Sequence, residues 1–193
     1  MRRGIPVLIA ILLAVAWLAR PTASAPARET YNVDAVHSVV LFRIQHLGVS
    51  YFYGRFNDIV GSFTVSEGKG AGAVDITIRA DSIDTNSEKR DGHLKSPDFL
   101  SVKQFPTITF KSEKLVSKGG NRYEATGTLT LHGVAKEITV DLERVGSGNA
   151  MGAYRTGFEG SFTISRSAHG MSWRPEALGD EIKLIVAIEG TRQ

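Results

Sequence analysis

A regular alternation of apolar and polar residues constrains this chain more than any other feature of its sequence. It begins near Tyr31 and is cleanest where Val74, Ile76 and Ile78 alternate with Asp75, Thr77 and Arg79. Successive side chains of a β-strand point to opposite faces, so the pattern predicts strands with one buried face and one exposed face. The chain is therefore predicted to be all-β.

The same pattern predicts eight strands. They are Tyr31–Leu47, Ser50–Val65, Val74–Arg79, Ile108–Phe110, Tyr123–Leu131, Ile138–Leu142, Tyr154–Ser165 and Ile182–Ile188. Glycine-rich turns such as Glu67–Gly70 and Lys118–Asn121 separate neighbours and favour antiparallel hairpins. Eight such strands close into a barrel or fold over as a sandwich, and the length of the strands favours an extended antiparallel β-barrel. A closed eight-stranded barrel is filled by side chains or holds one small ligand.

Five glycines lie inside the predicted strands, at positions 54, 61, 127, 157 and 160. A glycine within a strand marks a bend or a site where another group approaches closely. Two interpretations therefore stand side by side: relief of bending at the barrel corners, and room for a ligand.

Residues 1–25 are predicted to be a secretory signal peptide. Two arginines precede an apolar run from Ile5 to Ala19, and Ala23-Ser24-Ala25 offers a cleavage site, with Ala25-Pro26-Ala27 as a rival. The run falls short of the roughly 20 residues that a membrane-spanning helix needs, so an uncleaved anchor is the less favoured interpretation. We expect residues 26–193 to form one exported domain.

Export changes how the charge of the chain is interpreted. Residues 1–25 contain Arg2, Arg3 and Arg20 and no acidic residue. Once they are removed, 20 of the 23 basic residues remain, which equals the 20 acidic residues. The basic isoelectric point then gives no reason to expect nucleic-acid binding. The chain has no cysteine, which excludes disulfides, thiolate catalysis, covalent haem attachment and a lipid-modified N-terminal cysteine.

The five histidines show no spacing typical of a metal site or a catalytic site. The chain contains no H-x-H or H-E-x-x-H pair and no G-x-S-x-G elbow. We therefore expect no cofactor, no metal and no enzymatic activity. The alternative is a metal-dependent or hydrolytic enzyme on the same barrel that uses His37, His93 or His169. A third interpretation is a filled barrel that acts as a structural or adaptor protein.

The alternation stops at RDGHLKSPDFL, Arg90 to Leu100, where charged residues crowd around a few apolar ones. A polar residue followed by Glu88 predicts a short helix in the connection 86–100. If this helix covers a barrel mouth, its apolar residues point inward and its charged residues remain at the wet edge. The structural alternative is that Arg90 and His93 only bind the loop together through Asp91 and Asp98.

The predicted ligand site combines an apolar pocket with a polar rim. The pocket residues share an inward face: Val40, Phe42, Ile44, Phe56, Ile76, Ile78, Leu94, Phe99, Phe110, Leu129, Leu131, Phe158, Phe162, Met171 and Trp173. The rim residues are polar and are expected at the mouth of the barrel: His37, Arg90, His93 and His169. Met171 and Trp173 are expected to form a lid, and the alternative role of His37 is local hydrogen bonding at a strand entry. Such a site suits a long apolar body with a polar or anionic head, because each buried methylene contributes about 0.8 kcal/mol.

Taken in order, short stretches of the chain resemble the YceI-like family of exported, lipocalin-like proteins. These stretches cover nearly the whole of residues 26–193: Tyr31-Asn32-Val33-Asp34 with His37-Ser38, Phe42, His46, Gly54-Arg55-Phe56, Ser82-Ile83-Asp84-Thr85, Arg90 to Leu100, Phe105-Pro106, Gly127 to Val134 and Leu178-Gly179-Asp180-Glu181. The resemblance implies an eight-stranded antiparallel barrel, a periplasmic location and a long pocket for polyisoprenoid or related lipid chains.

We therefore expect a protein that binds a polyisoprenoid, quinone-like or fatty-amide lipid for carriage, storage or sequestration. Expected partners are this lipid and, transiently, a membrane, but no nucleic acid; the protein is expected to be a monomer or a homodimer. One departure from the family pattern is visible at Ser167-Ala168-His169-Gly170-Met171, where the family usually has an acidic-aromatic pair before the glycine. A histidine at this rim is expected to alter the preferred head group.

Overall fold

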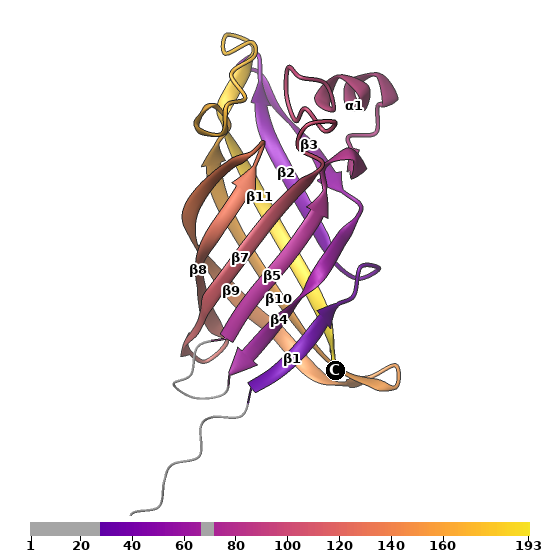
Figure 1. Cartoon of the computed structure of the whole chain (residues 1–193), viewed down its shortest axis with the longest axis vertical. Coiled ribbons are helices and arrows are strands. Elements are labelled where there is room, and N and C mark those ends of the chain that lie inside the picture. Colours follow the sequence, from indigo (N-terminus) through magenta and orange to yellow (C-terminus); the bar gives the residue numbers. More distant parts are fainter. Residues whose placement is uncertain (1–27, 67–71) are drawn as a thin grey trace, which may run out of the picture.

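The computed structural model describes residues 28–66 and 72–193, which form an elongated barrel with a short helix at one end (Figure 1). The predicted signal peptide with its two cleavage sites, and the predicted turn at Glu67–Gly70, lie outside the described residues. No helix in the described ranges has the length and apolar character needed to cross a membrane.

The described chain is all-β, as predicted, with one short α-helix in the predicted connection. The strands are β1 (Arg28–Val33), β2 (Val39–His46), β3 (Ser50–Phe56), β4 (Ile59–Ser66), β5 (Gly72–Arg79), β6 (Ile83–Asp84), β7 (Thr107–Gly119), β8 (Arg122–Leu131), β9 (Val134–Ala150), β10 (Ala153–Ser165) and β11 (Leu178–Arg192). The helices are α1 (Glu88–Leu94) and two 3₁₀ turns, η1 (Ala80–Ser82) and η2 (Ser167–His169).

Eight strands close the barrel, which confirms the predicted architecture. Hydrogen bonding follows the order β1-β4-β5-β7-β8-β9-β10-β11, and β11 pairs with β1 again to complete the ring. Every pairing is antiparallel. Beyond the end of β1, β11 pairs with β2 instead. β2 then pairs with β3, and β3 with β6, so that these strands extend the wall toward α1.

The first two predicted strands are each interrupted once. The carboxylate of Asp34 accepts hydrogen bonds from the backbone N–H groups of Val36 and His37, and this turn separates β1 from β2. The hydroxyl of Ser82 accepts bonds from the N–H groups of Asn57 and Asp58, which separate β3 from β4. These side chains offer the backbone an alternative to the ladder. The buried set also changes parity at each break: Tyr31 is buried in β1 but Val40 and Phe42 in β2. Likewise Phe56 is buried in β3 but Ile59 and Phe63 in β4. This change of parity is the sequence signal that each long predicted strand is interrupted.

Gly54 and Gly61 allow close approaches between neighbouring parts of the barrel. A Cβ atom on Gly54 would lie 2.4 Å from the Phe42 ring and 2.7 Å from the Thr85 methyl group. Gly61 has φ +143°, and a Cβ there would lie 2.1 Å from the carbonyl oxygen of Asp75. Both glycines therefore make room for the protein's own atoms, and neither opens space for a ligand.

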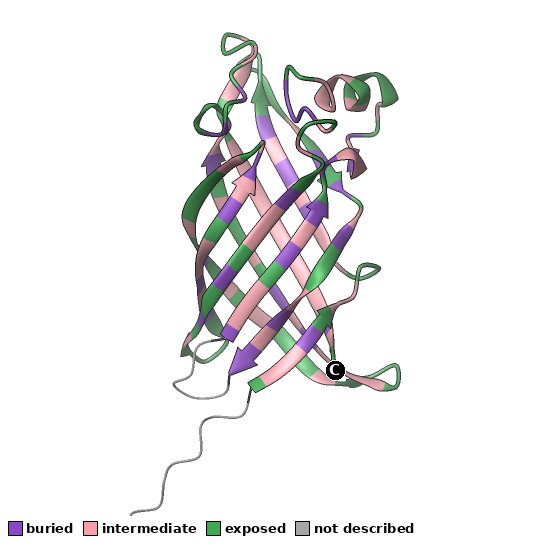
Figure 2. Cartoon of the chain, in the orientation of Figure 1, coloured by how far each residue is buried: buried purple, intermediate pink, exposed green. Residues whose placement is uncertain are grey.

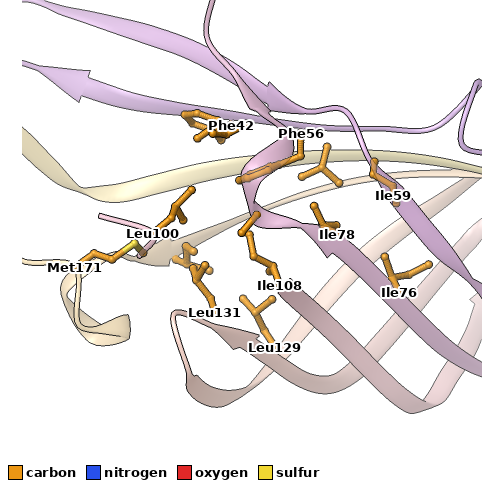
Figure 3. Packing of buried hydrophobic residues seen from close by; sticks show 14 residues of the cluster. Phe42, Phe56, Ile59, Ile76, Ile78, Leu100, Ile108, Leu129, Leu131 and Met171 are labelled. Atoms are coloured by element: carbon orange, nitrogen blue, oxygen red, sulfur yellow. The ribbon is translucent and has the colours of Figure 1, made fainter. Parts of the chain in front are cut away.

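The interior contains two apolar clusters, and burial alternates along the strands (Figure 2). The larger cluster fills the half near α1 and includes Phe42, Phe56, Ile78, Leu129 and Met171; Figure 3 shows its side chains converging from different strands. The smaller cluster is centred on aromatic residues from β1, β4, β8 and β10. The two clusters therefore divide the interior into an end near α1 and an aromatic end.

Candidate functional site

A cavity of about 200 Å³ lies inside the barrel. This volume is far above the roughly 10–15 Å³ that a single water molecule needs. Its lining side chains are apolar except for Thr109 and Arg166. The predicted pocket residues that line it are Val40, Phe42, Ile44, Phe56, Ile76, Ile78, Leu94, Phe99, Phe110, Leu129, Leu131, Phe162 and Met171. Their contact with a ligand remains a prediction.

Several lining residues were not among the predicted pocket residues. They include Phe52 on β3 and the inward face of β11, formed by Ile182, Leu184, Val186 and Ile188. The signal that identifies them is the same period of two, because β11 alternates these four residues with outward-facing ones. Period two therefore predicts which residues of β11 face the cavity.

Phe158 lies below the cavity, in an aromatic plug that closes the end away from α1. Its ring packs edge-on against Phe63 and Tyr123, with centroids 5.7 and 5.1 Å apart, and Phe63 stacks on Tyr31 at 5.3 Å. Tyr31 is fully buried, and this burial together with the nearby Glu29 carboxylate raises the pKa of its phenol well above the usual value. Phe158 thus faces inward as predicted, but at the height of the plug.

Two chain segments cover the opposite end of the cavity. Leu94, Phe99 and Leu100 reach it from the connection that contains α1, and Met171 reaches it from the segment after η2. We call these segments, 85–106 and 170–178, the lid. Trp173 joins the two halves from outside the cavity: its ring contacts His93 at 4.8 Å and Phe99 at 5.1 Å between centroids.

Arg90 and His93 hold the α1 half of the lid in place. Ser87 caps the helix by accepting a hydrogen bond from the Arg90 N–H. The Arg90 guanidinium donates to both the hydroxyl and the carbonyl of Thr85, and it lies over the Phe52 ring at 5.1 Å. His93 Nε2 lies 2.8 Å from the Asp98 carboxylate. The structural alternative is therefore observed for His93, whereas Arg90 bonds Thr85 and not Asp91.

Arg166 is the charged residue that sequence reasoning missed. It is 2% exposed and lines the cavity, yet its guanidinium donates to the backbone carbonyls of Gly179, Met171, Trp173 and Leu178. Desolvating a guanidinium is tolerable only when its donors are satisfied in this way. The side chain therefore fastens the 170–178 half of the lid to the barrel rim. Period two from Phe162 and Ile164 predicts its inward direction.

His169 is buried, not at a wet rim. It is 1% exposed, and its Nδ1 donates a hydrogen bond to the Val134 carbonyl at 3.3 Å. Burial lowers the pKa of its imidazole below the ordinary value of 6.5, because the charged form loses its hydration. The side chain that departs from the family pattern is therefore buried against the start of β9.

The lowered pKa of His169 predicts a loss of stability in mild acid. Below pH 6.5 the unfolded chain protonates this histidine and the folded chain does not, so stability falls as the pH drops toward the folded pKa. One such group contributes at most about 1.4 kcal/mol per pH unit. Urea unfolding of the wild-type protein between pH 7 and pH 5 (about two units) should show this slope, and His169→Asn should flatten it. Identical slopes in both proteins would contradict the assignment.

His37 lies away from the cavity, in the turn between β1 and β2, where its Nδ1 lies 3.0 Å from the Asp34 carboxylate. Asp34, His37 and Glu189 have ligand atoms close enough to hold a metal ion. However, Nη1 of Arg155 lies 2.6 Å from both carboxylates. Its hydrogen bond is the main reason that the pKa of Asp34 is far below its usual range. A guanidinium already neutralises this cluster, so a cation would have to displace it.

The predicted enzymatic alternative uses His37, His93 or His169 as a base or metal ligand. In the described chain, His37 contacts Asp34, His93 contacts Asp98 and Trp173, and His169 contacts Val134. These three environments share no contact and belong to a turn, a helix and a 3₁₀ turn. None of the three lines the cavity, whose described lining is almost entirely apolar.

Known proteins share this architecture. The model of the YceI-like domain matches residues 31–190. A UPF0312 protein of Pseudomonas paraeruginosa is 43% identical to the chain, over 89% of this chain and 92% of its own length. A UPF0312 protein of Pectobacterium carotovorum is 40% identical, over 94% of this chain and 95% of its own length.

Solved structures agree with these sequence matches. BcnA of Burkholderia cenocepacia superposes with a TM-score of 0.74 at 25% identity, covering 81% of this chain and 98% of its own. The YCEI protein of Campylobacter jejuni gives a TM-score of 0.69 at 30% identity, covering 77% and 90%. A polyisoprenoid binding domain from Saccharophagus degradans shares the fold, with a TM-score of 0.67 at 16% identity, covering 84% and 98%. The chain therefore belongs to the YceI-like family.

Proposed function

We propose that the protein binds one long-chain amphiphilic lipid inside the barrel. The observation that carries this proposal is the cavity itself. Its lining is apolar apart from Thr109 and Arg166, a plug closes one end, and a two-part lid covers the other. About ten methylenes buried there would contribute roughly 8 kcal/mol before the cost of immobilising the chain is subtracted. That gain favours a long chain over any small polar ligand.

The chemistry of the lid end limits the head group. Arg166 is the only charged residue in the lining, and four carbonyl groups already occupy its donors. A buried anion would have to compete with these carbonyls. The arrangement therefore favours a head group that is weakly polar or remains in solvent at the lid, as in a polyisoprenoid, a quinone-like molecule or a fatty amide.

The entrance is proposed to lie between β3 and α1. Within the described residues, β3 pairs with β6 only through Arg55 and Phe56, so its other residues have β2 alone as a neighbour. Phe52 lines the cavity at this edge, and Arg90 covers it from α1. Movement of the lid segment that carries Arg90 would open the wall beside Phe52.

The role is proposed to be carriage, storage or sequestration without catalysis, in the periplasm. Support for the location comes from the apolar run and small residues of segment 1–25, and support for the ligand class comes from the shared fold of the polyisoprenoid binding domain. Transient contact with a membrane is part of the proposal, because a lipid of this kind resides in a bilayer before and after carriage.

Calorimetric titration tests the proposal. Residues 26–193, purified free of lipid, should bind prenols, quinone analogues or fatty amides saturably, with one ligand per barrel. Glycerol and short organic acids serve as controls and should give no heat of binding. Absence of saturable binding for all three amphiphile classes would contradict the proposed function.

A further inference from the structure

The hairpin formed by β2 and β3 ends in apolar side chains that face water. At its tip, Leu47 is 59% exposed and Val49 is 84% exposed; on the outer face of β3, Tyr51 and Tyr53 are 52% and 55% exposed. We call these four residues the hairpin patch. Large apolar side chains gathered at one site of a soluble protein mark an interaction surface. Leu47 adopts φ +53° there, a conformation that costs energy for a side chain of this size.

The hairpin patch is continuous with the candidate site. The inner face of the same two strands lines the cavity through Phe42, Ile44 and Phe52. The Leu47 N–H donates to the Ala177 carbonyl at 2.7 Å, which ties the tip to the lid. Figure 1 shows the end of β2 and the start of β3 at the same end of the barrel as α1, away from the β9–β10 hairpin. A molecule seated on the patch would therefore lie next to the entrance proposed above.

The charges of the hairpin favour an anionic surface. Between Ala35 and Phe56 the chain contains no Asp or Glu, whereas it contains Arg43 and Arg55. Arg55 is paired with Asp84, but the Arg43 guanidinium lies over the Tyr51 ring at 4.3 Å, with no acidic partner among the described ion pairs. An aliphatic tip, two tyrosines and a cation stacked on one of them match the composition of protein segments that enter the headgroup region of a bilayer.

We propose that the protein docks on anionic phospholipid membranes through the hairpin patch. The tip inserts Leu47 and Val49 among the acyl chains, Tyr51 and Tyr53 lie at headgroup depth, and Arg43 faces lipid phosphate. This docking deepens the proposed function on which it rests, because it brings the edge of β3 against the bilayer that supplies the ligand. A lipid chain can then enter beside Phe52 without crossing water.

The β9–β10 hairpin supplies a matched control. Met151 at its tip is 80% exposed with φ +51°, and Val145 is 70% exposed, so it also presents apolar residues to water. It belongs to the plug end, and its Arg155 is held by Asp34 and Glu189. Leu47→Asp/Val49→Asp and Val145→Asp/Met151→Asp therefore make the same chemical change at opposite ends of one barrel.

Sedimentation with vesicles tests the docking. The wild-type protein should sediment with equimolar phosphatidylcholine and phosphatidylglycerol vesicles more than with pure phosphatidylcholine. Leu47→Asp/Val49→Asp should weaken this binding at least about 100-fold, because each of the two inserted apolar side chains contributes about ten-fold or more. Val145→Asp/Met151→Asp should bind like the wild type. An equal loss in both variants, an unchanged first variant, or no wild-type sedimentation would overturn the proposal.

Binding of geranylgeraniol in vesicle-free solution separates docking from ligand binding and also reports folding. Both double variants should keep the wild-type affinity within about two-fold, because the substituted side chains lie outside the cavity lining. Hairpin-dependent sedimentation together with this retained affinity supports the proposal. Failure of the wild-type protein to bind the prenol and, in the calorimetric titration, the quinone analogues and fatty amides, with hairpin-dependent sedimentation intact, would contradict the proposed function while the docking stands.

Discussion

Replacing Arg166 with methionine is expected to lower the free energy of unfolding by at least about 3 kcal/mol. The guanidinium is buried and donates to four backbone carbonyls, three of them in the lid segment 170–178. Methionine fills similar space but donates no hydrogen bond. Each carbonyl left without a donor in a buried place costs roughly 1–3 kcal/mol until water reaches it. The lid should therefore loosen before the barrel unfolds.

Trp173 makes this measurement direct, because it is the only tryptophan in residues 26–193 and lies within the lid. Urea unfolding monitored by its fluorescence should show an early transition in Arg166→Met that far-ultraviolet circular dichroism does not follow. Arg166→Lys is the matched control: it keeps the charge but offers fewer donors in a different geometry, so an intermediate loss is expected. Wild-type stability and a single transition in the methionine variant would show that the hydrogen bonds of Arg166 to the four carbonyls do not hold the lid.

Replacing Val186 with tryptophan is expected to weaken lipid binding on the order of 100-fold, because the indole removes room for about four methylenes of the ligand. Val186 lines the cavity in the middle of β11, where it pairs with Val40 on the neighbouring strand β2. A larger apolar side chain that enters an existing void adds little strain, so the barrel should fold with near-normal stability. The effect should therefore appear in binding alone.

Ile185→Trp is the control for Val186→Trp. Ile185 is the next residue on β11, and period two directs its side chain to the outer face, outside the cavity lining. This variant should bind fatty amides with the wild-type affinity in the same calorimetric titration. Equal weakening in both variants, or none in Val186→Trp, would mean that the ligand does not occupy the barrel centre.

Much of the barrel follows from period two because the hydrophobic pattern specifies which face of a strand is buried. Together with the length of the strands, it predicted the eight-stranded barrel, and it places inward many of the residues that line the cavity. It specifies the face but not the height along the barrel axis. Phe158 and Phe162 are both inward on β10, yet one belongs to the plug and the other lines the cavity. Height depends on strand stagger, which only the paired register reveals.

The polar groups of the site were harder to predict than the apolar ones. Period two predicts that Arg166 points inward, in register with Ile164. A charged residue at the end of an alternating strand is nevertheless usually solvated, so this direction alone does not predict that Arg166 is buried. Its acceptors are backbone carbonyls from a loop of irregular sequence, which no side-chain pattern encodes. His169 was expected at a solvent-exposed rim because it follows closely on the predicted strand that ends at Ser165. It does not give the direction of the 3₁₀ turn that buries this side chain.

Affinity as a function of ligand chain length tests the central claim most directly. In the calorimetric titration, saturated fatty amides of increasing length should bind more tightly by roughly three- to four-fold per methylene until the chain fills the hollow, after which affinity should level off. A constant affinity across the series would place the chain in solvent and contradict an apolar barrel interior as the binding site.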